Sequence, residues 1–232
     1  MLSKKNQVKI IAVLEHKNYK SFQDNFIAYP TDTKTVSSLV KLANKFNFNI
    51  ATVGSGSTFN SSANFDNILY LSTAKLNNII EIDMQNLFIN VGTGMIWSNL
   101  FNDLNEKSMF FPLLHEKDCG RTLGGIFSTL KPFSSAATYF KGIEFVSPTG
   151  EIINYGCKTL KNVAGYDLSQ FMLGSFGKFG IITSVLMKLF PTEKTFFTCD
   201  TIFDSCLSDT SSIESALLSR IKKNIDPSKV FV

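Results

Sequence analysis

The stretch KNVAGYDLSQFMLGSFGKFGIIT, from Lys161 to Thr183, decides the fold. Its second half is a glycine-rich loop, Gly174–Gly180, that leads directly into an apolar run beginning at Ile181. Glycines let the backbone reach positive φ and approach a ligand closely, and successive N–H groups of such a loop can bind an anion. One loop of this kind is weak evidence by itself, because a tight surface turn has the same composition.

Two further stretches of the same kind lie upstream. The first, Val53-Gly54-Ser55-Gly56-Ser57-Thr58, follows an expected strand, and the second is Gly120-Arg121-Thr122-Leu123-Gly124-Gly125. The first is no dinucleotide fingerprint of the G-x-G-x-x-G type, because Phe59 stands in the place of the third glycine. We expect the three loops to converge on one extended anionic ligand in a cleft between two lobes.

The remaining pattern indicates an α+β protein without the regular alternation of a doubly wound sheet. Apolar residues at helical spacing predict a helix over 33–46, with Thr33 as its N-cap, and a second helix over 211–224. Asp167 is expected to cap a further short helix. Strands are expected at 49–53, 68–71, 79–82, 87–91 and 181–190, and a hairpin is expected around Pro148-Thr149-Gly150.

Composition excludes several classes of protein. The 232 residues carry 23 Lys+Arg against 19 Asp+Glu, and the lysines look scattered along the chain, which argues against a nucleic-acid partner. The four cysteines form no C-x-x-C pair, so we expect free thiols and no metal site. No apolar run is long enough to span a bilayer, and the first residues lack the features of a secretory signal, so we expect a cytoplasmic protein.

The stretch from Lys161 to Thr183, followed by Leu189-x-Pro191, closely resembles the FAD-binding domain of the PCMH-type flavoproteins of the vanillyl-alcohol oxidase superfamily. Within that superfamily it is most similar to the E-type FAD-binding subunits of bacterial glycolate oxidases. The resemblance covers roughly 28–191. It implies a two-lobed FAD-binding domain over 1–191, with lobes at about 28–95 and 96–191 and FAD held between them.

The resemblance also implies which residues contact FAD. The first loop would bind the pyrophosphate, the second would approach the isoalloxazine and ribityl chain, and the strand that follows the third would pair by its backbone with the flavin or adenine end. The residues implied are Val53, Gly54, Ser55, Gly56, Ser57 and Thr58, then Thr122, Leu123, Gly124, Gly125 and Ser128, and finally Ile181 and Ile182. No histidine or cysteine has the spacing for covalent attachment, so we expect non-covalent FAD. Catalytic residues are not identified, and His115 is only a weak candidate because a lone histidine is more often structural.

Two departures from the family pattern stand out. The stretch 130–140 lacks the Tyr-Gly-x-x-Arg-Asp arm that lies near the cofactor in relatives. Loss of its cation would weaken binding by roughly 1.5–3 kcal/mol unless lysines compensate. The substrate cap is expected to be reduced to Thr192–Asp209, so 192–232 would hold a cap remnant and a closing helix, ended by the Lys222…Asp226-Pro227…Phe231 pattern.

The resemblance favours an FAD-binding subunit of a glycolate or lactate oxidase or dehydrogenase complex that is inactive alone. Its partners would be a larger FAD-linked subunit and an iron–sulfur subunit, and any membrane association would be peripheral and through these partners. One alternative is a degenerate scaffold that keeps the fold without flavin. A third reading, a reductase of cell-wall nucleotide sugars, shares the FAD domain but is not favoured by the KNVAGYD wording.

Overall fold

The computed structural model describes residues 2–14, 18–22, 25–56, 67–111, 120–130, 136–156, 171–192 and 212–232, and only the backbone at 136–137 and 212–218. The helices are α1 (Lys4–Val13), α2 (Thr33–Phe46), α3 (Trp97–Glu106), α4 (Leu123–Thr129) and α6 (Ser212–Ile225), with short 3-10 turns η1 (Thr73–Lys75) and η3 (Ala136–Tyr139). The strands are β1 (Tyr19–Phe22), β2 (Asn25–Ala28), β3 (Asn49–Val53), β4 (Ile68–Ser72), β5 (Ile79–Asp83), β6 (Phe88–Gly92), β7 (Met109–Phe110), β8 (Phe140–Val146), β9 (Ile152–Gly156), β10 (Ile181–Lys188) and β11 (Phe190–Pro191).

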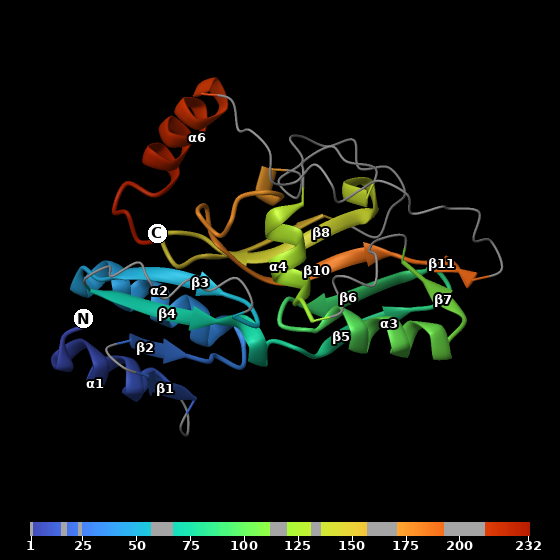
Figure 1. The fold of residues 1–232 in the computed structure, drawn as a ribbon, viewed down its shortest axis with the longest axis horizontal. Coiled ribbons are helices and arrows are strands. Elements are labelled where there is room, and N and C mark those ends of the chain that lie inside the picture. The colour runs from blue at the N-terminus through green and yellow to red at the C-terminus, as the bar shows by residue number, and fades with distance from the viewer. Residues whose placement is uncertain are drawn as a thin grey trace.

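The first lobe is a four-stranded sheet in the order β1-β2-β4-β3. Strands β2, β4 and β3 are parallel, whereas β1 pairs antiparallel with β2 as a hairpin. Helix α2 connects β2 to β3, as a parallel connection requires, and it has the limits predicted from its apolar stripe. Helices α1 and α2 lie together on one side of this sheet (Figure 1).

The second lobe is an antiparallel five-stranded sheet in the order β5-β6-β10-β8-β9. Helices α3 and α4 lie beside this sheet, and α4 contacts β10 (Figure 1). The expected hairpin is confirmed as β8 and β9, joined through a turn in which Gly150 has φ 82°. The single strand expected over 181–190 is instead β10, ending at Lys188, and the short β11, which pairs with β7. The α+β fold class is confirmed.

The N-cap of α2 lies one residue before the predicted one. Asp32, not Thr33, is the N-cap, and its Oδ1 accepts a hydrogen bond from the Thr35 amide at 2.8 Å. The Thr33 hydroxyl instead donates to Glu144 Oε1 at 2.5 Å, and the Thr183 hydroxyl donates to the same oxygen at 2.8 Å. Glu144 on β8 therefore ties the start of α2 to the second sheet.

The two lobes have separate cores that interlock at one place. The core of the first lobe, which includes Leu39, Ile50 and Leu69, also receives Val146 and Ile181 from the second sheet. The next residue, Ile182, packs into the core of the second lobe. The start of β10 is thus a shared element, because adjacent residues of a strand point to opposite faces.

The C-terminal segment returns to the first lobe. Phe231 forms a parallel bridge with Ile50, whose amide donates to the Val230 carbonyl at 2.6 Å. The buried Asp226 carboxylate fixes this segment, because its two oxygens accept the amides of Val230 and Phe231 at 2.8 and 3.0 Å. The Asp226…Phe231 pattern therefore serves to hold the last residues against β3.

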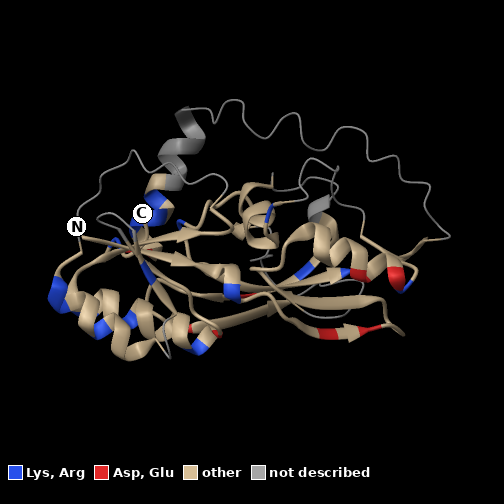
Figure 2. Cartoon of the chain, turned by 60° about the horizontal axis from the view of Figure 1, so that its bottom comes forward, with Lys and Arg blue, Asp and Glu red and all other residues tan. Residues whose placement is uncertain are grey.

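Lysines gather on the first two helices at one end of the molecule, although other basic residues lie along the rest of the chain (Figure 2). Helices α1 and α2 contain six lysines and no acidic residue, namely Lys4, Lys5, Lys9, Lys34, Lys41 and Lys45. The acidic residues Glu81 and Asp83 of β5 and Asp103 and Glu106 of α3 lie at the opposite end. The fold brings together lysines that are far apart in the sequence.

Candidate functional site

The first glycine loop leaves the carboxyl end of β3, beside the parallel strand β4. Ligands of parallel sheets commonly bind outside this end of the strands. Within the described part of the loop, Gly56 has φ 85°, a conformation that side chains other than glycine rarely adopt. The Ser72 hydroxyl at the end of β4 donates to the Gly54 carbonyl at 3.2 Å and fixes the start of the loop. The predicted residues Ser57 and Thr58 lie outside the described residues.

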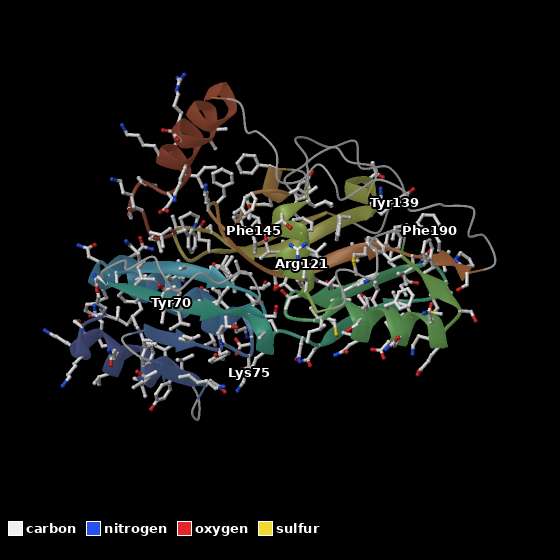
Figure 3. The ribbon with its side chains drawn as sticks, viewed as in Figure 1. Tyr70, Lys75, Arg121, Tyr139, Phe145 and Phe190 are labelled. Atoms are coloured by element: carbon white, nitrogen blue, oxygen red, sulfur yellow. The ribbon has the colours of Figure 1, made fainter. Side chains whose placement is uncertain are left out.

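The second loop packs directly on the first. Thr122 is the N-cap of α4, and a Cβ built on Gly54 would lie 2.4 Å from the Thr122 Oγ1. Only glycine fits at residue 54 without movement. Arg121, which lies where the two lobes adjoin (Figure 3), donates from Nη2 to the Gly125 carbonyl at 3.0 Å and to the Thr129 hydroxyl at 2.7 Å.

Amides of the second loop are already hydrogen-bonded within the protein. Those of Leu123 and Gly124 donate to the carbonyls of Met95 and Thr93, and that of Gly125 donates to the Thr122 hydroxyl. This part of the loop therefore has few free donors for a ligand, although its glycines would let a ligand approach the backbone closely.

The third loop packs on the two elements that flank the other loops, the helix α4 and the strand β3. The amide of Phe176 donates to the Ser128 carbonyl of α4 at 3.1 Å. A Cβ built on Gly177 would lie 3.4 Å from the Cβ of Thr52 on β3. Gly174, Phe176 and Gly177 all have positive φ, so the loop turns sharply before β10. The three loops, distant in sequence, meet at the carboxyl end of β3, as the glycine pattern predicted.

The predicted strand residues lie next to this junction but point inward. Ile181 and Ile182 are both buried, one in each core, so only their backbone could face a ligand. The arm segment 131–135, the weak candidate His115 and residues 193–209 of the expected cap remnant lie outside the described residues. So do Asp167 and most of the helix expected after it, of which Phe171 and Met172 are described as helical. No group of three potential metal ligands occurs among the described residues.

Two side chains at the junction were missed by the sequence analysis. Thr52 Oγ1 and Ser175 Oγ are buried and have no hydrogen-bond partner among the described residues. No signal in the sequence singled out Thr52, because the sequence does not show which side chain of β3 meets the third loop.

Cations lie near the third loop. Burial lowers the pKa of Lys222 on α6, Lys178 of the third loop lowers it further, and Asp226 opposes the change. The three loops carry the cations Arg121 and Lys178 and no acidic residue over 53–58, 120–125 and 174–180. Their charge therefore suits an anion.

A separate cavity of about 210 Å³ lies between the turn 31–33 and the second sheet. Leu76, Ile80, Gly92 and Thr183 line it, and none of the predicted FAD residues does.

The family comparison shows to which family the chain belongs. Residues 25–156, more than half of the chain, match the family described as FAD binding domain. The chain belongs to this FAD-binding family. The resemblance stated from the motif is confirmed, and FAD is the cofactor of the domain.

Curated relatives agree with this assignment. Glycolate oxidase subunit GlcD of Bacillus subtilis is 29% identical over 88% of this chain and 44% of the relative. A D-lactate dehydrogenase of Archaeoglobus fulgidus is 30% identical over 72% of this chain and 39% of the relative. A solved structure of alkyldihydroxyacetonephosphate synthase matches with TM-score 0.70 and 20% identity, over 82% of this chain and 41% of that one, which supports the fold. The FAD-binding domain spans less than half the length of these relatives.

The residues present fit FAD. Phosphate groups need hydrogen-bond donors, and the junction offers two buried hydroxyls that have no partner among the described residues. The assignment of individual predicted residues to parts of FAD remains a prediction.

Proposed function

We propose that the FAD-binding domain is a subunit of a 2-hydroxy acid oxidoreductase of the glycolate or lactate type, through whose non-covalent flavin electrons pass. The observation that carries the proposal is the junction of three glycine loops at the end of β3. Similarity to a glycolate oxidase subunit and to D-lactate dehydrogenases supports the substrate class. We further propose a larger FAD-linked subunit and an iron–sulfur subunit as its partners, and the cytoplasm as its location.

When bound, FAD supplies the acceptor for a hydride from the hydroxy acid carbon. The chain's own residues hold and orient it. The first and third loops would bind its phosphates, while α4 and the second loop provide a close-packed wall. Arg121 stiffens that wall, because one guanidinium nitrogen binds both Gly125 and Thr129 in successive turns of α4. No residue that would take the substrate hydroxyl proton is identified among the described side chains.

No helix among the described residues has the length and apolar character to cross a membrane.

Flavin content tests the proposal. The purified chain should be yellow, keep its visible flavin band through gel filtration, and release the flavin into the supernatant after acid precipitation, because attachment is non-covalent. Colourless protein that takes up no added FAD would support the scaffold alternative instead. Flavin that stays with the precipitate would contradict non-covalent binding.

The substrate and partners need a second experiment. The chain should be co-expressed with a candidate larger flavoprotein and an iron–sulfur protein encoded beside it, and purified through a tag on this chain alone. We expect a complex that reduces an artificial acceptor with glycolate or D-lactate. A flavin-loaded chain that recruits neither protein would contradict the subunit assignment while leaving FAD binding intact.

A further inference from the structure

Two buried hydroxyls at the loop junction have no partner among the described residues. They are Thr52 Oγ1 on β3 and Ser175 Oγ in the third loop. Ser175 is only 5% exposed. A buried polar group without a hydrogen bond destabilises the fold, and such groups are rare in native proteins. Two of them at one junction therefore point to a group that binds there.

The surroundings of the Thr52 side chain show where its hydroxyl lies. Thr52 is near the end of β3, and Gly54, just beyond the strand, packs against Thr122 of the second loop. The Thr52 Oγ1 lies 3.6 Å from a Cβ built on Gly177. The hydroxyl is thus directed into the contact between β3 and the third loop, beside the loop that leaves β3.

More than half of the backbone amides over 174–180 are already engaged. Four of them are hydrogen-bonded within the protein: Gly174 to Phe127, Ser175 to Met172, Phe176 to Ser128 and Lys178 to Ser175. The two hydroxyls therefore add donors at a loop where several amides are not available to a ligand.

We propose that the hydroxyls of Thr52 and Ser175 donate hydrogen bonds to the phosphate groups of FAD. The proposal rests on the FAD site proposed above and adds two residues to it. Phosphate oxygens accept readily from neutral hydroxyls, and no carboxylate in the three loops would repel them. Thr52 would thereby compensate in part for the absent cationic arm of the family pattern.

The test compares two substitutions of Thr52 with a matched control. Thr52→Val removes the hydroxyl at constant shape, and Thr52→Ser keeps it. The control is Ser37→Ala in α2, away from the loops, because the buried Ser37 hydroxyl already donates to the Gly150 carbonyl. Dissociation constants come from quenching of FAD fluorescence, and midpoints of thermal unfolding are measured without cofactor.

We expect Thr52→Val to weaken FAD binding by about tenfold, as for a hydrogen bond to a charged group. Its cofactor-free form should melt at or above the wild-type temperature, because an unpaired buried group has been removed. Thr52→Ser should bind within about threefold of wild type. Ser37→Ala should do the reverse of Thr52→Val, with a lower melting temperature and unchanged FAD affinity. Ser175→Ala should behave like Thr52→Val.

Two outcomes would overturn the proposal. Wild-type FAD affinity in both Thr52→Val and Ser175→Ala would show that the hydroxyls do not contact the cofactor. A lower melting temperature of cofactor-free Thr52→Val would show that the hydroxyl is structural. Competition with ADP and with riboflavin shows which part of FAD the hydroxyl contacts. Thr52→Val should weaken the binding of ADP, which carries phosphates, but not the binding of riboflavin, which carries none. If the wild type itself binds no FAD, the site and this assignment both fail, whereas loss in the variants alone leaves the site intact.

Discussion

A Cβ on Gly54 would lie 2.4 Å from the hydroxyl oxygen of Thr122, although these residues belong to different loops and different lobes. This distance is too short for a real Cβ atom, so the Thr122 side chain packs directly against the backbone of Gly54. Because Thr122 also caps α4, the position of that helix depends on residue 54 remaining glycine. The packing of the cofactor site is therefore coupled to the packing of the two lobes.

Gly54→Ala should destabilise the domain by about 1–3 kcal/mol, because Thr122 or β3 must shift to admit the methyl group. Urea unfolding measures the loss, and FAD titration should show weaker binding. Gly120→Ala is the matched control, since a Cβ there meets nothing within 4 Å and should change stability by less than about 0.5 kcal/mol. Equal stability of the two variants would contradict the close contact.

Gly56 is constrained by its backbone and not by its neighbours. Its φ is 85°, yet a Cβ built on it meets nothing within 4 Å among the described residues. Gly56→Ala should cost about 1 kcal/mol, whereas Gly56→Asn should cost less, because asparagine tolerates left-handed backbone. Thermal unfolding without cofactor compares the two. A larger loss for asparagine would indicate crowding and would contradict the open surroundings. A bulky residue at this position should abolish FAD binding and leave the fold intact.

Asp226 should prove necessary for holding the C-terminal segment against β3. Asp226→Ala removes a carboxylate that accepts two amides, so the unfolding free energy should fall by about 2–3 kcal/mol. Hydrogen exchange should quicken at the amides of Val230 and Phe231. Glu106→Ala, at an exposed position on α3, is the control and should alter neither measurement. Unchanged exchange in Asp226→Ala would show that the segment is held by other contacts.

The lowered pKa of Asp32 should make the stability of the domain depend on pH. Burial raises the pKa of its carboxyl, but hydrogen bonds from Thr35 and the charge of Lys34 outweigh burial, so the pKa lies below the ordinary 3.8. Because the folded pKa is the lower one, the stabilisation is complete above the unfolded pKa and is lost as pH falls through the folded pKa.

Asp32→Ala should therefore cost about 1 kcal/mol at neutral pH, as for loss of a helix cap, and much less near about pH 2. The difference in melting temperature between wild type and Asp32→Ala, followed across this range, gives the result. A difference that stays constant down to the lowest pH would show that Asp32 does not cap α2 through its charged form.

Local pattern predicted much of the fold. The apolar stripe of α2 gave its limits because burial at helical spacing depends on neighbouring residues only. The cap was misplaced by one residue because the Thr33 hydroxyl is engaged by Glu144, which is 111 positions away. The docking of Phe231 beside Ile50 was missed for the same reason. Contacts between distant parts of the chain leave no periodic signal.

The packing of the glycine loops was predicted in outline, whereas their role as an FAD site stays a prediction. Glycine spacing indicated three loops at one place, because glycine is needed where backbone approaches closely, as at Gly54. It did not show which amides would be free, and the bonds from Gly124 to Thr93 and from Phe176 to Ser128 depend on the packing of α4. The hydroxyl of Thr52 stood out only once its surroundings were known.

The pairing of Phe231 with β3 also affects which strand edges of this domain are open to a second copy. Exposed strand edges invite pairing with another molecule, and here the last residues occupy one side of the four-stranded sheet. Of its described strands, that leaves β1 as the open flank. Deleting the final residues would uncover a second flank next to the first glycine loop, and the shortened protein should oligomerise or aggregate through β3.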